Sequence, residues 1–268
     1  MERTLKDFQS IVIKIGSSSL THDSGLIDFY KMDSLVRQIA NLHNSGKDVV
    51  VVSSGAIAAG IGKMKLKEKP STIPEKQAAA AVGQGTLMYM YEKLFSEYGV
   101  TVAQVLLTRE DMYQEVRREN SINAFNSMIK HRIVPIVNEN DVVAIDEIKV
   151  GDNDTLSAEV CKMLAFENLT IMSDIEGVYN KDPRVHADAF MIEYIGSLPE
   201  LSQIEAGDAG SMVGTGGMQT KIRAAQIIAE AGSTMFIVNS GHPDVLNELL
   251  HGKKCGTFFD FRTDKRKK

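Results

Sequence analysis

The fold is decided first by the stretch IVIKIGSSS at residues 11–19. Residues 11–15 form a short apolar run before a turn, which predicts a buried strand of a mainly parallel sheet. The run contains Lys14, and a lysine inside a buried strand is unfavourable unless its ammonium group has an anionic partner. The Gly16-Ser17 turn that follows offers backbone N–H groups to oxygen atoms. Either Lys14 faces an anionic ligand, or it is an edge-strand lysine that faces solvent.

From this strand outward, short apolar runs alternate with longer helical patterns along the chain. Such alternation is typical of crossover units around a mainly parallel sheet. We therefore predict an α/β fold, a doubly wound αβα sandwich around a mainly parallel open sheet. The predicted strands are 11–15, 48–52, 102–107, 133–137, 169–172 and 234–238; the main predicted helices are 35–42, 76–98, 157–166 and 217–231, and a hairpin is predicted at 142–150. Within the 76–98 helix, Gly83 and Gly85 are expected at close-packing or bend points.

The composition limits the classes of function that fit. The chain has 268 residues, 43% of them hydrophobic, and a formal net charge of −5. This mild acidity argues against nucleic-acid binding, which needs clustered Lys and Arg, and the basic tail 265–268 is interpreted as a solvated terminus. Cys161 and Cys255 are too few for a disulfide framework, and neither lies at metal-ligand spacing. The first residues lack a signal-peptide pattern and no apolar run approaches the ~20 residues of a membrane span, so we expect a cytoplasmic protein without a membrane partner.

Polar residues and glycines gather where the predicted strands end, which is where open α/β sheets bind ligands. Ser53-Ser54-Gly55 leads from a strand into a small-residue helix start, and the donors there favour a carboxylate or phosphate. Asn138–Asp141 and Gly151–Asp154 place several amides and carboxylates close together. Such groups hold Mg²⁺, accept hydrogen bonds from an amino group or orient lysines, although the same residue types are also common in solvated turns.

Two further clusters fit a nucleotide. Ser173–Pro183 leaves a predicted strand with Tyr179 beside polar groups, which suits a base-binding slot or a plain exit from the strand. Gly214–Lys221 comes immediately before a long helical pattern. Its glycines let the backbone approach phosphates, the helix dipole favours them, and Lys221 can lie across a transferred group. The GxxxxGK[ST] spacing of a Walker A loop does not occur in this sequence.

Taken together, these clusters resemble the amino acid kinase family. The segments that carry the resemblance keep the family's order from Ile11 to Ile222: VIKIGSSSL, VVSSGAIAAG, AAVGQ, LLTREDM, PIVNENDVVA, EIKVGDND, SDIEGVYNKDPR and GTGGMQTKI. Each segment alone is weak, but the ordered set is specific. Relatives that act on aspartate, N-acetylglutamate, carbamate or UMP share the glycine and lysine elements, whereas PIVNENDVVA and KVGDND point to the glutamate branch. Ser53 and Ser173 stand where relatives often carry threonine, a change that leaves a hydroxyl.

The resemblance implies roles for individual residues. The residues expected to bind ATP are Lys14, Ser173, Asp174, Thr215, Gly216, Gly217, Met218, Gln219, Thr220 and Lys221. The residues expected to bind glutamate are Ser54, Gly55, Asp141 and Asn153. Catalysis is expected from Lys14 on the phosphoryl group in transit, Lys221 on the leaving β-phosphate side, and Asp154 holding both lysines. Mg²⁺ is expected to bridge the ATP phosphates with few direct protein ligands, so no protein metal site is expected.

The resemblance also implies a domain organisation and a pathway. One kinase domain is expected over 1–268, with a glutamate-binding part at about 1–170 and a nucleotide-binding part at about 171–260. The chain stops soon after the kinase fold, so a form without the C-terminal PUA domain of many relatives is expected. The implied activity is ATP-dependent phosphorylation of the glutamate side-chain carboxylate, the first step of proline biosynthesis. Proline as feedback inhibitor, a glutamyl phosphate reductase as partner, and a homodimer or homotetramer are implied in the same way.

Free glutamate carries an ammonium group that needs an anionic partner. Asp141 is the best candidate, with Asn153 and the Ser54 region on the α-carboxylate; an acylated substrate would leave Asp141 as an unpaired buried charge. The glutamate side chain has a pKa of about 4.3, so the nucleophile is ionised at neutral pH and needs no general base. Two alternatives stay open: a related kinase for aspartate or N-acetylglutamate, and a sensor that binds amino acid and nucleotide without transfer. A sensor does not need Lys14, Asp154 and Lys221 together.

Overall fold

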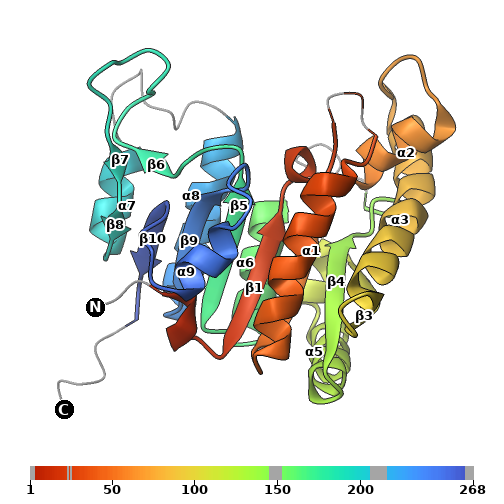
Figure 1. Ribbon diagram of the computed structural model, residues 1–268, viewed down its shortest axis with the longest axis horizontal. Helices are drawn as coiled ribbons and strands as arrows, with labels where there is room; N and C mark the ends of the chain where they lie inside the picture. The colour runs from red at the N-terminus through yellow and green to blue at the C-terminus, as the bar shows by residue number, and fades with distance from the viewer. Residues whose placement is uncertain (1–3, 23, 25, 145–152, 206–215, 263–268) are drawn as a thin grey trace. The chain divides into compact units, whose positions relative to one another are not determined.

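The computed structural model describes residues 4–22, 24, 26–144, 153–205 and 216–262 (Figure 1). The chain divides into two compact units. The N-terminal unit comprises residues 13–153, and the C-terminal unit comprises residues 154–268 together with residues 1–12. Strand β1 (Ser10–Ile15) contributes residues to both units. Thr215, most of the predicted 142–150 hairpin and the basic tail lie outside the described residues.

Parallel strands form the centre of the N-terminal unit. Strands β2 (Asp48–Ser53), β3 (Thr101–Leu107) and β4 (Ile133–Glu139) join β1 in the order β3-β4-β2-β1. β3 and β4 pair in parallel from Thr101 opposite Ile133 to Leu107 opposite Glu139, and β2 also pairs in parallel with β4. The carboxyl ends of β2 and β4 therefore lie at one edge, with their polar terminal residues side by side.

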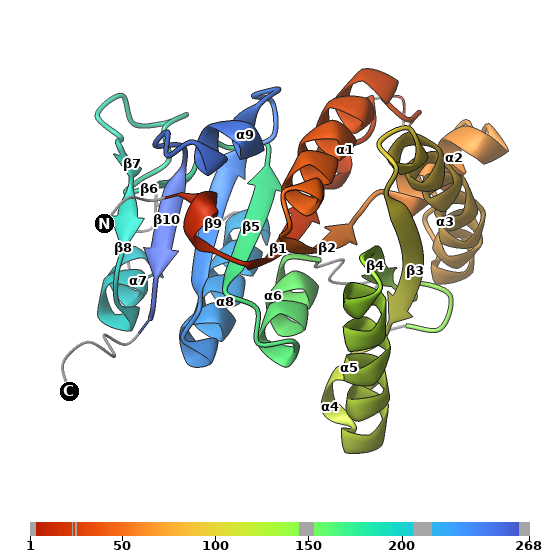
Figure 2. The same ribbon diagram turned by 60° about the horizontal axis from the view of Figure 1, so that its bottom comes forward.

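Helices cover both faces of these strands. Figure 2 shows α1 (Phe29–Asn44) and α3 (Ile73–Ser96) on one face and α5 (Glu115–Lys130) on the other, with α2 (Ala56–Met64) beside α3 and the short α4 (Arg109–Tyr113) before α5. The side chain of Asp28 caps α1 by accepting from the backbone of Lys31. A capping box formed by Thr72 and Glu75 starts α3.

Helices α2 and α3 pack closely because of two glycines. A Cβ atom on Gly60 would lie 1.8 Å from the carbonyl oxygen of Ala79, and one on Gly83 would lie 1.7 Å from that of Ala56. Only a hydrogen fits at either position, so the prediction of a close-packing site is confirmed for Gly83. It is wrong for Gly85, because no atom lies within 4 Å of a Cβ built there, and α3 continues through it.

The strands of the C-terminal unit follow the order β5-β9-β10-β8. β5 (Asn168–Ser173) pairs in parallel with β9 (Thr234–Asn239) along its whole length. β10 (Thr257–Asp260) is antiparallel to β9 and parallel to β8 (Tyr194–Ile195), and β6 (Val178–Tyr179) forms a separate antiparallel pair with β7 (Met191–Ile192). The parallel pairing places Ser173 beside Asn239 where both strands end.

Helices also cover both faces of the C-terminal strands. Figures 1 and 2 show α9 (Val245–Leu250) on one face of β5 and β9, and α6 (Asn153–Met163) and α8 (Gly216–Ala231) on the other; α7 (Leu198–Glu205) follows β8. The predicted α/β fold with mainly parallel strands between helix layers is confirmed. None of the helices among the described residues has the length and apolar character needed to cross a membrane.

Candidate active site

In the N-terminal unit, β2 ends in a turn that exposes donors at the start of α2. Gly55 has a φ of +96°, a left-handed conformation that glycine adopts without strain, and it precedes the first residue of α2. The backbone N–H of Ser54 donates to the carbonyl of Ile15 at 3.1 Å, which ties the turn to β1. The hydroxyl of Ser53 lies 3.2 Å from the carbonyl oxygen of Ser54 and shares a 2.8 Å hydrogen bond with the buried hydroxyl of Tyr91. Burial raises the pKa of Tyr91, so this phenol stays neutral.

An amide network connects this turn to the end of β4. The side-chain Nδ2 of Asn153 lies 2.8 Å from the carbonyl oxygen of Ser53, 3.0 Å from Ser54 Oγ and 3.0 Å from Asn138 Oδ1. Asn138 in turn donates from its Nδ2 to Gln84 Oε1 at 2.9 Å. Ser54 and Asn153, both expected to bind glutamate, are therefore in direct contact. The network consists of neutral groups only.

A buried donor of this network has no hydrogen-bond partner among the described residues. Gln84 is 9% exposed, and its Nε2 is a buried donor without an acceptor. Leaving such a donor unsatisfied costs about 1–3 kcal/mol, so native structures rarely retain one without a functional reason.

Asp141 and Lys14 are the two charged residues of the N-terminal unit that the sequence predicts to lie in the site. Asp141 follows β4 in a turn and is half-buried, and this burial raises the pKa of its carboxyl group to about 6. The raised pKa indicates a carboxylate that has lost water contacts and would gain from a cation. Lys14 lies on β1 and is only 8% exposed, so the solvent-facing alternative for this lysine is wrong.

In the C-terminal unit, Asp154 and Lys221 form a buried ion pair. Lys221 Nζ lies 3.1 Å from Asp154 Oδ2, and the two residues are 7% and 3% exposed. The same carboxylate oxygen accepts a 2.8 Å hydrogen bond from the hydroxyl of Thr220, and Lys221 also donates to the carbonyl of Gly217 at 3.2 Å. Asp154 lies in the first turn of α6 and the other residues in the first two turns of α8. The predicted contact of Asp154 with Lys14 stays a prediction.

The lysine end of this pair opens into a pocket of about 340 Å³. The wall combines the residues after β5, the β6 region and the start of α8: Ser173, Asp174, Ile175, Glu176, Tyr179, Pro183, Arg184, Gly217, Met218 and Lys221. Arg184 donates three hydrogen bonds to Asp182, two from its guanidinium group and one from its backbone N–H, and these bonds lower the pKa of that carboxyl group to about 2. The volume and the mixture of apolar and charged groups suit a small ligand with anionic groups.

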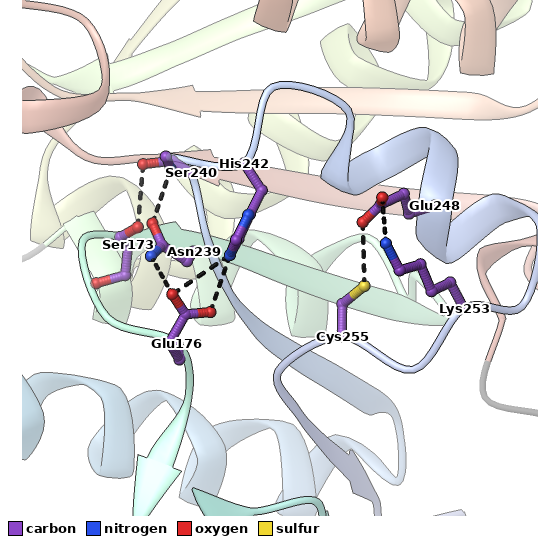
Figure 3. A network of polar contacts seen from close by, with 9 residues as sticks. Ser173, Glu176, Asn239, Ser240, His242, Glu248, Lys253 and Cys255 are labelled. Carbon is purple, nitrogen blue, oxygen red and sulfur yellow. Dashed lines mark hydrogen bonds and ion pairs between the residues drawn. The ribbon is translucent and has the colours of Figure 1, made fainter. Parts of the chain in front are cut away.

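The loop after β9 is hydrogen-bonded to two residues of the pocket wall, Ser173 and Glu176 (Figure 3). The backbone N–H and the hydroxyl of Ser240 both donate to the carbonyl of Ser173, at 2.7 and 3.0 Å. Asn239 Nδ2 donates to Glu176 at 2.7 Å, and His242 Nε2 lies 3.1 Å from the same carboxylate. The bonds from these two residues lower the pKa of Glu176, so it lines the pocket as an anion at neutral pH.

The other predicted site residues lie as follows. Ser173, Asp174, Gly217 and Met218 line the pocket with Lys221, and Gly216 begins α8. Gln219 is exposed on α8 and is not part of the pocket wall. Among the described residues, no group of three or more His, Cys, Asp or Glu side chains is arranged to hold a metal ion.

Sequence reasoning assigned no role to several residues of the two clusters. Gln84 and Asn138 lie in the AAVGQ and PIVNENDVVA segments, and Glu176 lies in SDIEGVYNKDPR, so their motifs were visible but their hydrogen bonds were not. His242 and Asn239 belong to no quoted segment. Their contribution follows from the parallel pairing that places the end of β9 beside the end of β5.

Known proteins similar to this chain identify its family. Residues 9–239 match the amino acid kinase family. The chain belongs to the amino acid kinase family. The resemblance inferred from the sequence is therefore confirmed.

Relatives in this family include proteins of similar length. The amino acid kinase described here is 54% identical to "Glutamate 5-kinase" of Clostridium tetani over 96% of each chain. It is 52% identical to "Glutamate 5-kinase" of Clostridium acetobutylicum, with 96% of this chain and 97% of the relative covered. Among solved structures, isopentenyl phosphate kinase matches with a TM-score of 0.63 at 20% identity, covering 93% of this chain and 99% of that chain. This last likeness supports the amino acid kinase fold alone.

Proposed function

We propose that this amino acid kinase transfers the γ-phosphoryl group of ATP to the side-chain carboxylate of L-glutamate, which yields L-glutamyl 5-phosphate and ADP. The observation that carries the proposal is the 54% identity, over 96% of each chain, to a relative named glutamate 5-kinase. The reaction is the first step of proline biosynthesis. The relatives do not favour the alternatives of an aspartate or N-acetylglutamate kinase or of a sensor.

The N-terminal unit would bind glutamate. Ser54 offers its hydroxyl and Gly55 its backbone N–H at the start of α2, where a carboxylate is favoured. Asn153 touches Ser54 directly, and Asp141 supplies a half-buried carboxylate for the substrate ammonium. An N-acylated substrate lacks that ammonium and would leave Asp141 unpaired, so the site favours the free amino acid.

The C-terminal unit would bind ATP in the pocket beside Lys221. The N–H groups of Gly216 and Gly217 stand at the start of the 16-residue helix α8, where its dipole favours phosphate. Lys221 would neutralise charge on the β-phosphate side as ADP leaves, and its contact with Asp154 holds the ammonium in place. The predicted division into a glutamate-binding part at about 1–170 and a nucleotide-binding part at about 171–260 remains part of this proposal.

The chemistry needs positioning and charge stabilisation. An ionised side-chain oxygen of glutamate attacks the γ-phosphorus, the new carboxyl O–P bond forms, and the bond from the γ-phosphorus to the β–γ bridging oxygen breaks with its electrons leaving on ADP. No proton is removed from the nucleophile, because a glutamate side chain with a pKa of about 4.3 is already a carboxylate. Lys14 is proposed to contact the phosphoryl oxygens during transfer.

A divalent cation, proposed to be Mg²⁺, would accompany ATP. The carboxylates of Asp174 and Glu176 on the pocket wall are oxygen ligands of the kind that hard cations take. Since the described residues hold no cluster of three such groups, most ligands would come from the phosphates. When bound, the ion neutralises phosphate charge; Lys14 and Lys221 act on the oxygens that it leaves free.

Further properties are proposed on the same basis. Proline would act as feedback inhibitor, and the labile acyl phosphate would pass to a glutamyl phosphate reductase in the cytoplasm. A homodimer or homotetramer is supported by large apolar side chains exposed on the N-terminal unit, among them Tyr89, Tyr113 and Val116.

Hydroxylamine trapping tests the proposed function. The purified protein is incubated with MgATP, hydroxylamine and one of L-glutamate, L-aspartate, N-acetyl-L-glutamate or UMP, and both hydroxamate and ADP are measured. We expect hydroxamate with glutamate alone, matched by ADP, and suppression by proline. Hydroxamate with a different acid would overturn the substrate, and nucleotide binding without any turnover would support the sensor.

A further inference from the structure

The amide network of the N-terminal unit has a fixed direction, which backbone groups impose. An amide side chain presents oxygen on one side and NH₂ on the other, and the choice follows from its hydrogen-bond partners. At Asn153 the deciding partner is the backbone carbonyl of Ser53, 2.8 Å away, which only accepts. The reversed amide would place two acceptor oxygens in contact. Asn153 therefore turns its Nδ2 toward Ser53.

The same reasoning fixes Asn138 and then Gln84. The backbone N–H of Glu139 lies 2.9 Å from Asn138 Oδ1 and only donates, so this oxygen cannot be exchanged for the NH₂ group. Asn138 Nδ2 therefore faces Gln84 and donates to it, so Gln84 must accept this hydrogen bond through its Oε1, 2.9 Å away. Each amide in the series Gln84, Asn138, Asn153 thus has one permitted orientation.

These orientations determine which groups remain for a ligand. Asn153 Nδ2 has two hydrogens and three acceptors within 3.0 Å, so its donors are already used. Its Oδ1 accepts no hydrogen bond from the described residues. Ser54 Oγ accepts from Asn153, which leaves the hydroxyl hydrogen of Ser54 free to donate. An acceptor and a donor therefore remain.

We infer that Asn153 presents its side-chain carbonyl oxygen to the ammonium group of the substrate, and that Gln84, acting through Asn138, is the positioning residue that holds this orientation. The inference rests on the proposed function, since it concerns the glutamate site. It differs from the expectation that Asn153 binds the α-carboxylate. Ser54 and the first turn of α2 take that carboxylate, while Asp141 and Asn153 share the ammonium, whose three N–H groups need acceptors.

Gln84 is suited to this indirect role by its burial. Its side chain is 9% exposed, and its Nε2 has no acceptor among the described residues. An apolar side chain of similar length would avoid the cost of burying an unsatisfied donor. The benefit of glutamine at this position is therefore the oxygen that it presents to Asn138. Without that acceptor Asn138 keeps only its contacts to Glu139 and Asn153 and gains freedom to rotate.

Substrate analogues test the orientation at Asn153. Glutarate lacks the ammonium and keeps both carboxylates, whereas L-glutamate α-amide keeps the ammonium and lacks the α-carboxylate. Each is measured as a competitive inhibitor against glutamate, in the wild type and in Asn153→Ala and Ser54→Ala. Hydroxamate formation by the wild type is established first, so that failure of the proposed function is recognised separately.

The two substitutions are expected to give opposite patterns. Asn153→Ala should weaken glutamate and the α-amide by about tenfold or more and leave glutarate nearly unchanged, because only the first two carry the ammonium. Ser54→Ala should weaken glutamate and glutarate and affect the α-amide less. If Asn153→Ala weakened glutarate as much as glutamate and spared the α-amide, Asn153 would be a carboxylate donor and the inference would be wrong. Comparing analogues within one variant cancels any general loss of folded protein.

Gln84 is tested by a conservative series with a matched control. Gln84→Met removes the acceptor and should raise the KM for glutamate by about tenfold, with kcat and the KM for ATP within about threefold. Gln84→Glu keeps an oxygen toward Asn138 and should restore much of the affinity. Leu87→Met, a buried volume-conserving change on the same helix, should leave the KM unchanged. Equal effects of Gln84→Met on glutamate and glutarate would contradict a role through Asn153.

Discussion

Asn153 and Asp154 are neighbours in the chain, yet their side chains belong to two different kinds of network. Asn153 joins a network of neutral amides and hydroxyls in the N-terminal unit. Asp154 joins a buried ion pair with Lys221 in the C-terminal unit. Neutral amides in fixed orientations discriminate between donors and acceptors, whereas full charges stabilise a changing charge at short range. The contrast separates substrate selection from phosphoryl transfer.

The largest expected effect comes from the charged network. Lys221→Met should lower kcat by about 10²–10³-fold, because a donor to the phosphoryl oxygens is lost in the transition state. Lys14→Met is expected to act in the same way, and the KM for glutamate should change little in either variant. The measurement is kcat from ADP release.

Folding controls accompany these variants. Lys221→Met removes the cation beside the buried carboxylate of Asp154 and should also lower the free energy of unfolding. Lys221→Arg keeps a cation beside Asp154. If this variant loses much of its kcat while its free energy of unfolding stays normal, the loss is due to catalysis and not to stability. A near-normal kcat in Lys221→Met would contradict the role of the charged network in phosphoryl transfer.

The next largest effect is expected for Asp141, which is proposed to select the substrate through its ammonium group. Asp141→Asn should raise the KM for glutamate by about 10–100-fold, since a hydrogen-bonded charge pair with the ammonium is lost, and should leave kcat and the KM for ATP nearly unchanged. Steady-state kinetics with each substrate varied in turn provide the check. A drop in kcat with an unchanged KM for glutamate would show that Asp141 acts in phosphoryl transfer and not in substrate binding.

The pH dependence sharpens the role of Asp141. Burial raises its pKa from 3.8 to about 6, so in the free enzyme the carboxylate loses its charge as the pH falls through about 6. We expect kcat/KM for glutamate to fall about tenfold per pH unit below that value, and Asp141→Asn to lack this limb.

The contribution of Asp141 to folding stability is expected to change with pH in the opposite direction to kcat/KM. A carboxyl group whose pKa is higher in the folded than in the unfolded protein favours folding as it takes up its proton. Asp141 should therefore contribute added stability as the pH falls from about 6 toward about 4, and this contribution should be absent in Asp141→Asn. Denaturant unfolding at several pH values measures it.

The smallest effects concern the helix that carries Gln84. Gly83→Ala should destabilise the protein by about 1–3 kcal/mol, because its Cβ meets the carbonyl of Ala56, and should raise the KM for glutamate more than the KM for ATP. Gly85→Ala on the same helix has open space and should stabilise by about 0.5–1 kcal/mol. Urea unfolding of both variants tests the pair, and equal destabilisation would contradict the close packing of α2 on α3.

Much of the fold follows from the sequence because apolar runs and helical periods are local signals. β1, β2, β4 and α8 lie where the patterns predict them. The pairing of Ser54 with Asn153 follows from the rule that polar strand ends gather. The orientation of Gln84 and the contact of Asn239 with Glu176 depend on residues more than 50 positions apart, so no local pattern contains them. Gly85 was misjudged because the sequence does not tell which side of α3 packs on α2.

The most direct test of the separation is one kinetic experiment on two variants. KM for glutamate, KM for ATP and kcat are measured for Asp141→Asn and Lys221→Arg beside the wild type. The account predicts that Asp141→Asn changes mainly the KM for glutamate and that Lys221→Arg changes mainly kcat. If both variants altered the same constant to a similar extent, the two networks would act as one, and the division between selection and transfer would be contradicted.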